Sequence, residues 1–534
     1  MNKIEAWKLE RDGLTVGELL SHYAAQGWES IPEDDVQRLK WYGLFLRNPT
    51  PGHFMLRVRI PGGKTTSYQL NALAEIAARF GNAILDVTTR QQVQVRHLTI
   101  RNVPEVFALL KSVGLTSLQT GMDSVRNVMT CPVAGLNPNE LLDGTEIVRA
   151  INQEVLGNPA YSNLPRKCNV AVTGCLDNCL HLETQDIALV PAYHDLGYDK
   201  CYGYNVLVGG KLGSGGYRIA TPLDLFLNPA EAFEVCRTLL EIYRDHGPRE
   251  NRTQARLAFL VEAWGEARLR CEVERRLGKT LPAAGIDARP LAEKDHIGIF
   301  RQKQRGMNYV GLKILVGRVK ADELRRIAGL AERYGSGEVR LSPAQAFMIP
   351  NVSDRHVGEL AEDPLVKQFA YNPSPLYKGL VSCVGSDYCN LAVIETKSRA
   401  VETARALEKR VGEGMKPITL HWSGCPAGCG NHLVSDIGLL GKKAKVGGKV
   451  VDAVDVFVGG RSGPDPKLAT RIMEDVPCDR LPALLETLMP YHTREKMHRV
   501  RGKADKKPPM SRVGPSAGDM TAVTTIRTPQ RLPA

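Results

Sequence analysis

The chain has 534 residues, of which 43% are hydrophobic and 24% are charged, and its formal net charge at pH 7 is +12. These proportions exclude a disordered or fibrous protein, and the length predicts two to four folded domains. The sequence contains no apolar run long enough to span a membrane, and its first residues lack the apolar core of a secretory signal. We therefore expect a cytoplasmic protein that has no membrane partner.

The two ends of the chain differ from its middle. Residues 1–50 include WESIPEDDVQRLKWYGLFLR, which predicts an amphipathic helical arm whose aromatic side chains pack on the main body. Residues 501–534 contain seven Lys or Arg, two Asp and no aromatic residue. This composition predicts a disordered basic tail.

Between these ends the sequence repeats itself at an offset of 254 residues. Residues 55–81 and 309–335 each predict a short strand followed by an amphipathic helix that ends at a glycine. Residues 85–95 and 339–349 each predict a further strand pair with alternating apolar positions. The apolar helix positions Leu70, Leu73 and Ile76 fall on Leu324, Ile327 and Leu330.

The repeat continues at an offset of 250 residues. Cys175 and Cys179 overlay Cys425 and Cys429, and the Gly-Gly pair at 209–210 overlays the pair at 459–460. A match of this length predicts a duplicated two-part unit of mixed α/β (α+β) class. We expect the two copies to be related by pseudo-twofold symmetry.

Four cysteines in the second copy have the spacing of a metal centre. Cys383 and Cys389 form C-x5-C, and Cys425 and Cys429 form C-x3-C, all within glycine-rich segments. Four thiolates hold a [4Fe-4S] cluster in many proteins, and they equally suit tetrahedral zinc. The spacing alone leaves both metals open.

The two copies differ in charge. Arg57 falls on Gly311, Arg90 falls on Ala344, and Lys167 falls on Pro417, so these basic groups occur only in the first copy. Asn169 likewise falls on Thr419. The division predicts one cofactor site between the halves, with the metal on one side and cations on the other.

The remaining cysteines have no complete ligand pattern. Cys175 and Cys179 form C-x3-C, but only Cys131 and Cys168 are available to complete a second cluster or metal site. We expect a thiol pair that no longer binds metal, with a second metal site as the alternative. Buried thiols without a special role are expected at Cys201, Cys236, Cys271 and Cys478.

The cysteine segments and the basic segments together resemble the siroheme-dependent nitrite and sulfite reductases over about residues 50–495. The resemblance implies a [4Fe-4S] cluster on Cys383, Cys389, Cys425 and Cys429, with Cys429 also bridging to the siroheme iron. It implies substrate-side residues at Arg57, Arg126, Lys167 and Asn169. Contacts to the siroheme carboxylates are expected from Arg90, Arg166, Lys211 and Arg461, and Gln91 is expected to contact the cofactor.

The same resemblance implies a domain division. After the arm, it gives a ferredoxin-like half-domain over 51–120, a siroheme- and substrate-binding domain over 121–290, a second half-domain over 291–370, and a cluster- and siroheme-binding domain over 371–500.

The resemblance also implies the reaction, which is the six-electron reduction of nitrite to ammonia. Sulfite-reducing members commonly carry a second Lys where this chain has Asn169, and a neutral amide suits the monoanion nitrite. Sulfite reduction to sulfide is the alternative. Lys167 is the expected proton donor, because neighbouring arginines lower the pKa of an amine.

The electrons are expected from an outside carrier. GGKLGSGG at 209–216 lacks the spacing of a dinucleotide-binding loop, and no flavin module is recognisable. A basic surface suits an acidic ferredoxin, with flavodoxin as the alternative partner. We expect a monomer without a nucleic-acid partner. The competing class is a four-cysteine zinc protein that binds nucleic acid. Aromatic residues, which such proteins interleave with basic ones, are only 6% of the chain.

Overall fold

The computed structural model describes residues 2–213, 215–412 and 415–491. The predicted basic tail at 501–534 lies outside these residues. Over the part that is described, no helix combines the length and the apolar character that crossing a membrane requires. The cytoplasmic location, the monomeric state and the domain boundaries stay predictions.

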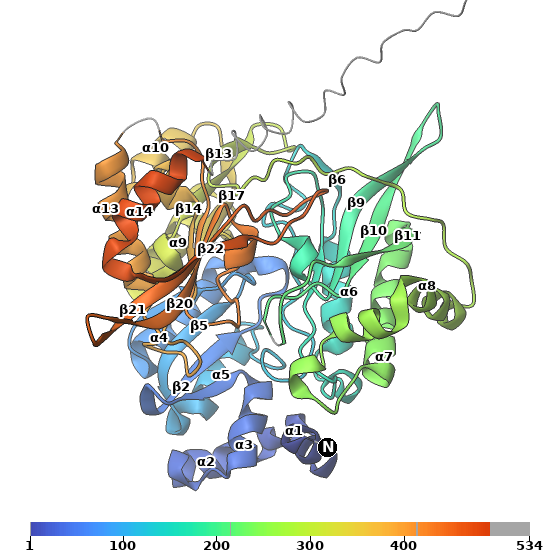
Figure 1. The fold of residues 1–534 in the computed structure, drawn as a ribbon, viewed down its shortest axis with the longest axis horizontal. Helices are drawn as coiled ribbons and strands as arrows, with labels where there is room; N and C mark the ends of the chain where they lie inside the picture. Colours follow the sequence, from blue (N-terminus) through green and yellow to red (C-terminus); the bar gives the residue numbers. More distant parts are fainter. Residues whose placement is uncertain (1, 214, 413–414, 492–534) are drawn as a thin grey trace, which may run out of the picture. The chain divides into compact units, whose positions relative to one another are not determined.

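The N-terminal arm is helical and docks on the body through specific contacts (Figure 1). The Trp41 side chain is only 2% exposed, and its indole N–H donates to the carbonyl of Ser162 at 2.7 Å. Lys8 is also buried and lies 3.3 Å from the carboxylate of Asp123. Its α-helices are α1 (Lys3–Glu10), α2 (Leu20–Gln26) and α3 (Glu33–Arg38).

Two five-stranded antiparallel sheets follow, one from each copy of the repeat. The first has the order β1 (Leu44–Arg47), β2 (Thr50–Val58), β5 (Val93–Thr99), β4 (Ile84–Val87), β15 (Arg318–Lys320). The second has the order β13 (Gly298–Arg301), β14 (Met307–Lys313), β17 (Ala346–Ser353), β16 (Glu338–Ser342), β3 (Lys64–Thr66). The last strand of each sheet therefore comes from the other copy.

The strand exchange is reciprocal. β15 pairs with β4 so that Arg318 lies opposite Asp86, and β3 pairs with β16 so that Lys64 lies opposite Arg340. Each exchanged strand runs directly into a helix, α4 (Ser67–Phe80) or α9 (Ala321–Tyr334), and these two helices contact each other. The predicted apolar helix positions are buried in one shared core. The other helices of this region are α5 (Val103–Ser112), α10 (Val357–Glu362) and α11 (Pro364–Gln368).

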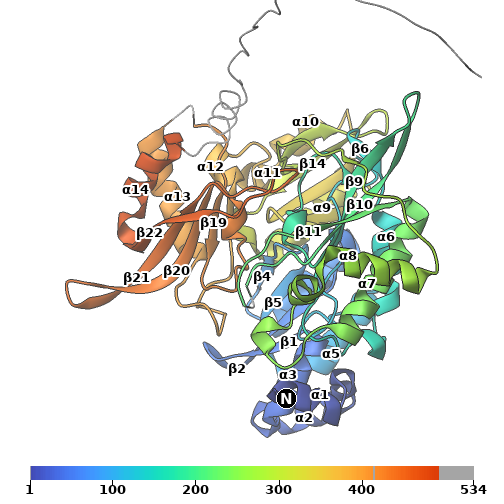
Figure 2. The same cartoon turned by 45° about the vertical axis from the view of Figure 1, so that its right-hand side comes forward.

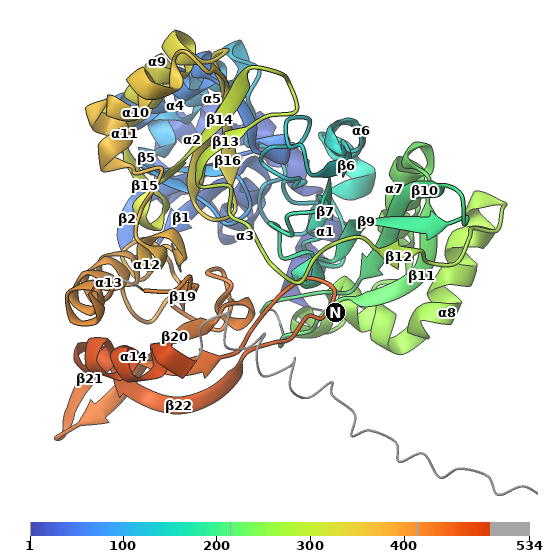
Figure 3. The same ribbon diagram turned by 90° about the horizontal axis from the view of Figure 1, so that it is seen from above.

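Two mixed sheets follow, and each joins parallel strands to antiparallel strands (Figures 2 and 3). One contains β7 (Val170–Val172), β9 (Ile187–Asp195), β10 (Lys200–Val208), β11 (Thr221–Leu227) and β12 (Ile286–Asp287). The other contains β18 (Leu380–Ser382), β19 (Leu420–Ser423), β20 (Ile437–Val446), β21 (Lys449–Val458) and β22 (Thr470–Pro477). The first of these sheets has one parallel pair, β7–β9, and the second has two, β18–β19 and β19–β20. The strand pairs β7–β9 and β19–β20 correspond at the offset of 250 residues, which confirms the duplicated mixed fold.

Each mixed sheet has its own hydrophobic core and its own helices. Figure 1 shows the teal and green helices beside β9 to β11 and the orange and red helices beside β20 to β22. The first set is α6 (Thr145–Val155), α7 (Ala232–His246) and α8 (Leu257–Leu277). The second set is α12 (Pro375–Lys378), α13 (Lys397–Val411) and α14 (Leu481–Leu488), and the short strands β6 (Glu140–Leu142) and β8 (Gly174–Cys175) pair with each other.

A glutamine from the first copy joins the two halves. Gln91 is fully buried, and its side-chain amide donates to the carbonyls of Thr130 and Leu341, each at 2.9 Å. Its side-chain oxygen accepts a hydrogen bond from the Thr130 backbone N–H at 3.2 Å. Both amide hydrogens of Gln91 are therefore used in hydrogen bonds to backbone carbonyls. This residue, which the sequence predicted as a siroheme contact, has a structural role.

The second copy contributes the equivalent glutamine, because 254 residues separate Gln91 from Gln345. Gln345 donates to the carbonyls of Val87 and Ser382 at 3.3 and 2.9 Å, and it accepts from the Ser382 backbone N–H at 3.1 Å. Each glutamine thus bonds to one carbonyl of the other copy's sheet. The pair fixes how the two halves meet.

Replacing Gln345 by alanine is expected to destabilise the protein by about 2 to 4 kcal/mol, because it leaves three buried backbone groups without partners. The urea midpoint should fall, and hydrogen exchange in the peptide containing Ser382 should accelerate. The exposed Gln26→Ala change is the control. An unchanged midpoint and unchanged exchange at Ser382 would contradict the structural role of the glutamine.

Candidate functional site

A cavity with about 760 Å³ of empty space lies where the first copy's sheet faces the loops of the second copy. All four cysteines of the predicted cluster line it, together with Arg57 and Arg90 from the first copy. The structure therefore brings the predicted metal ligands and the predicted cations into one site.

The local fold positions the cysteines on loops at strand ends. Cys383 directly follows β18, its N–H donates to the Trp422 carbonyl at 3.0 Å, and its sulfur accepts from the Gly424 N–H at 3.1 Å. A Cβ atom on Gly430 would lie 1.9 Å from the Trp422 carbonyl oxygen, so a larger residue does not fit this tight turn.

The thiols need a cationic centre to become ligands. Burial raises the pKa of Cys383, and burial raises the pKa of Cys425 to about 12. Only the thiolate binds a metal, and a bound metal ion supplies the positive charge that stabilises it. The chemistry of this donor set therefore fits a metal cluster.

Several buried polar atoms of the first copy have no hydrogen-bond partner within the protein. They are the Nε atoms of Arg57, Arg90 and Arg166, one guanidinium NH group of Arg126, and the side-chain oxygen of Asn169. Buried polar groups in native proteins normally have partners. Arg57 and Arg90 line the cavity, whereas Arg126, Arg166 and Asn169 are not among the described residues that line it. The unused guanidinium donors of this group indicate a site for an anion.

Electrostatic repulsion within this group is strong. Burial, with repulsion from Arg90 and then Arg47, lowers the pKa of Arg57 to about 9. Burial, followed by Arg57 and Arg90, also lowers the pKa of Arg126 well below its ordinary value. An anionic ligand would raise the pKa values of both arginines again, because it adds an opposite charge at short range.

Lys167 and Asn169 are held close to the cations by a buried ion pair. Asp186 accepts two hydrogen bonds from Arg256, at 2.8 and 2.6 Å, and one from the Asn169 backbone N–H at 2.7 Å. Burial lowers the pKa of Lys167 well below its ordinary value, and electrostatic repulsion from Arg256 and Arg90 lowers it further. The charge of a Cys429 thiolate raises the pKa of the same amine. The lysine therefore lies within electrostatic reach of the cysteine loop.

Two residues that were predicted to contact the siroheme form hydrogen bonds to residues four positions further along the chain. Lys211 donates to the Gly215 carbonyl at 2.7 Å, and Arg461 donates to the carbonyl and the carboxylate of Asp465 at 2.7 and 2.9 Å. Neither residue is among the described residues that line the cavity. Their assignment to the cofactor stays a prediction.

Arg47 is a further cation of the cavity that the sequence did not indicate. Arg47 lines the cavity, its Nε atom has no partner, and burial with repulsion from Arg96 lowers its pKa to about 10. Arg96 also lines the cavity but is neutralised by Asp86 at 2.7 Å. A comparison of the copies cannot detect Arg47, because its counterpart Arg301 is also an arginine.

Comparison with protein families matches most of the chain. The model of the nitrite and sulphite reductase 4Fe-4S domain matches residues 121–281 and 378–507. The model of the nitrite/sulfite reductase ferredoxin-like half domain matches residues 47–113 and 300–366. A 4Fe-4S domain is therefore part of this chain, which favours a cluster over zinc.

Individual proteins resemble the chain over nearly its full length. A ferredoxin–nitrite reductase from Synechococcus elongatus is 43% identical and covers 92% of this chain and 96% of the relative. An assimilatory ferredoxin-dependent nitrite reductase from Haloferax mediterranei is 36% identical, with coverage of 91% and 88%. The NirA protein of Mycobacterium tuberculosis has a solved structure that is 29% identical, with a TM-score of 0.87 and coverage of 94% and 96%. With both family models matched twice, the chain belongs to the nitrite and sulfite reductase family.

Proposed function

We propose that this chain reduces nitrite to ammonia with six electrons supplied by reduced ferredoxin. The observation that carries the proposal is the single cavity in which four cysteines of one copy face unpaired cations of the other. The ferredoxin-dependent nitrite reductases among its relatives support the choice of substrate and donor. The reduction of sulfite on the same scaffold is the second candidate.

The residues present fit a [4Fe-4S] cluster and a siroheme. Four cysteines are the usual ligand number for such a cluster, and a siroheme carries carboxylates that suit unused guanidinium donors. We assign the cluster to Cys383, Cys389, Cys425 and Cys429, with Cys429 shared with the siroheme, and we assign the siroheme carboxylates to Arg90, Arg166 and the newly found Arg47. When bound, the two cofactors supply the electrons and a metal position for the substrate.

The chain's own residues bind the anion and supply protons. Arg57 and Arg126 each offer an unused N–H donor that is itself buried, so their attraction for nitrite is stronger than it would be in water. Reduction removes both nitrite oxygens as water and therefore consumes protons. Lys167 is placed to hold such a proton, because its lowered pKa brings an amine closer to the working pH.

Asn169 is proposed to set the preference for nitrite. Its side-chain oxygen is buried and unpartnered, whereas its backbone N–H is fixed by Asp186. A neutral amide adds no further charge to a wall that already holds several cations. Sulfite carries more negative charge near neutral pH than nitrite does, so it would gain more from a lysine at this position.

The function is tested by turnover of the holoprotein with reduced ferredoxin at low ionic strength. We expect one ammonia for each nitrite consumed, a slower reaction with sulfite, and no reaction with a pyridine nucleotide alone. Because docking of an acidic carrier on a basic protein is screened by salt, about 0.3 M salt should reduce kcat/KM for ferredoxin several-fold. Turnover with the nucleotide alone, or with flavodoxin but not ferredoxin, would reject this carrier.

Lys167→Met is expected to lower kcat for nitrite about 100-fold, because it removes a proton donor and a positive charge from the site. Iron content and the visible spectrum should match those of the unmodified protein, which shows that the cofactors are loaded. The exposed Lys111→Met change is the control. Equal turnover and equal nitrite affinity in the loaded Lys167→Met variant would remove this residue from the mechanism.

Asn169→Lys is expected to shift the ratio of nitrite to sulfite activity toward sulfite, because the added charge favours the more highly charged anion. Asn169→Gln keeps a neutral amide and should retain the preference for nitrite. The measurement is ammonia and sulfide production with the same reduced carrier. An unchanged ratio in the lysine variant would show that this position does not select the substrate.

A further inference from the structure

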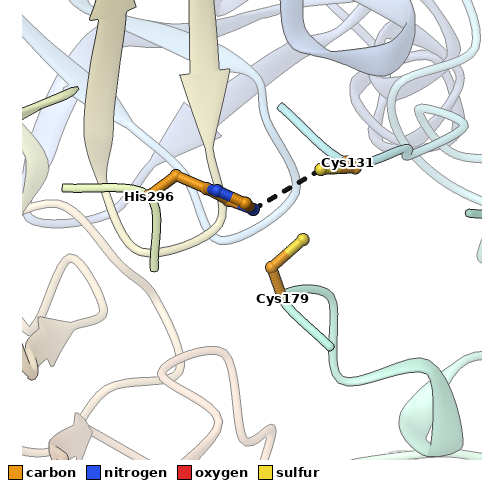
Figure 4. Close-up of side chains that lie close together, drawn as sticks. All are labelled: Cys131, Cys179 and His296. Carbon is orange, nitrogen blue, oxygen red and sulfur yellow. Dashed lines mark hydrogen bonds between the residues drawn. The ribbon is translucent and has the colours of Figure 1, made fainter. Parts of the chain in front are cut away.

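A second group of metal-binding side chains lies outside the cavity described above. Cys131, Cys179 and His296 have their sulfur and imidazole nitrogen atoms within 4.8 Å of one another, and Figure 4 shows the three side chains converging. Cys175 and Asp177 form a second such group with the same histidine. His296 therefore lies at the meeting point of three thiols.

The thiols occupy the positions of the cluster cysteines in the other copy. Cys175 and Cys179 correspond to Cys425 and Cys429, and an offset of 252 residues places Cys131 on Cys383. The counterpart of Cys389 at that offset is Asn137, whose side-chain amide donates to the Cys175 sulfur at 3.2 Å. His296 brings a fourth ligand from a different part of the chain.

The spacing of Cys131, Cys179 and His296 favours one metal ion over a second cluster, and Cys175 adjoins them through the shared His296. The Cys131 sulfur lies 3.5 Å from the His296 Nε2 atom. Ligands of one tetrahedral zinc ion are separated by about 3.5 to 3.8 Å, given metal–ligand bonds of about 2.0 to 2.3 Å. By contrast, no three of the four described cysteines assigned to the cluster approach one another within 4.8 Å.

The surroundings of the group are those of a metal site. Asp177 donates its backbone N–H to the Cys175 sulfur at 3.3 Å, so that with Asn137 two N–H donors point at this sulfur. The other imidazole nitrogen, Nδ1 of His296, lies 3.2 Å from the Tyr309 hydroxyl and 3.9 Å from the Asp177 carboxylate. Such partners orient a histidine so that its free nitrogen faces a metal.

Burial and access also suit a bound ion. Cys131, Cys175 and His296 are at most 1% exposed and lie next to an apolar cluster that includes Tyr309 and Met348. Cys179 is half-buried and lines a separate surface cavity with Lys294. The site is thus enclosed on three sides and reachable through one thiol.

We propose that Cys131, Cys175, Cys179 and His296 bind one divalent metal ion of the zinc type in tetrahedral geometry. The ion joins the first copy's loops to the segment that enters the second copy at β13. Three soft thiolates and one imidazole are the ligand set that zinc takes in structural sites. The site is independent of the proposed nitrite chemistry, because none of its four ligands is among the described residues that line the cofactor cavity.

The test is metal analysis of the untagged holoprotein after anaerobic purification. We expect about one zinc per chain in addition to about five iron atoms, the latter belonging to one cluster and one siroheme. X-ray absorption at the zinc edge should show three sulfur ligands at about 2.3 Å and one nitrogen at about 2.0 Å. This measurement needs no variant, so it does not depend on how a substitution affects folding.

Cys179→Ser and His296→Gln should each lower the zinc content at least five-fold while the iron content and the visible spectrum stay unchanged. Cys201→Ser, which alters a half-buried thiol elsewhere, is the matched control and should retain the zinc. Absence of zinc from the holoprotein would overturn the proposal. So would about nine iron atoms per chain that fall to about five in Cys179→Ser, because that result assigns the ligands to a second cluster.

Discussion

The structure depends on one electrostatic constraint, which is that several guanidinium groups at and near the cavity lie deep enough in the protein and close enough to other arginines to have lowered pKa values. Arg47, Arg57 and Arg126 each lose basicity there and keep unused donors. Such an arrangement is unfavourable for the protein alone. It can persist because the surrounding fold is fixed elsewhere, and the entry of an anion would make it favourable.

The exchanged strands and the paired glutamines supply that rigidity. β3 and β15 cross between the sheets, and Gln91 and Gln345 bond to backbone groups of both copies. The glutamine bonds are made next to the residues that face the cavity. The joint between the halves therefore also sets how far the cysteine loops lie from the cationic wall.

Much of this could be predicted from the sequence, because a duplication leaves a constant offset that can be read without a structure. The offset predicted the mixed fold, and the places where the copies differ predicted which half carries the cations. The exchange of β3 and β15 could not be predicted, since strands of three residues have no readable periodicity. The resemblance implies a cofactor contact at Gln91, and only the structure shows that its amide bonds to backbone carbonyls.

The same limits explain two omissions. Arg47 matches an arginine in the other copy, so comparing the copies does not single it out. His296 is an isolated histidine between elements, and nothing in its local sequence connects it to cysteines more than a hundred residues earlier.

The strand exchange has a consequence for how the chain folds. Arg318 and Asp86 are 232 positions apart in the sequence, so the first sheet keeps an open edge until β15 has been made. At a synthesis rate of about 5 to 20 residues per second, that edge stays unpaired on the ribosome for about 10 to 50 seconds. Unpaired edges recruit other strands, so a nascent chain of this architecture depends on protection during translation in a way that its finished form does not.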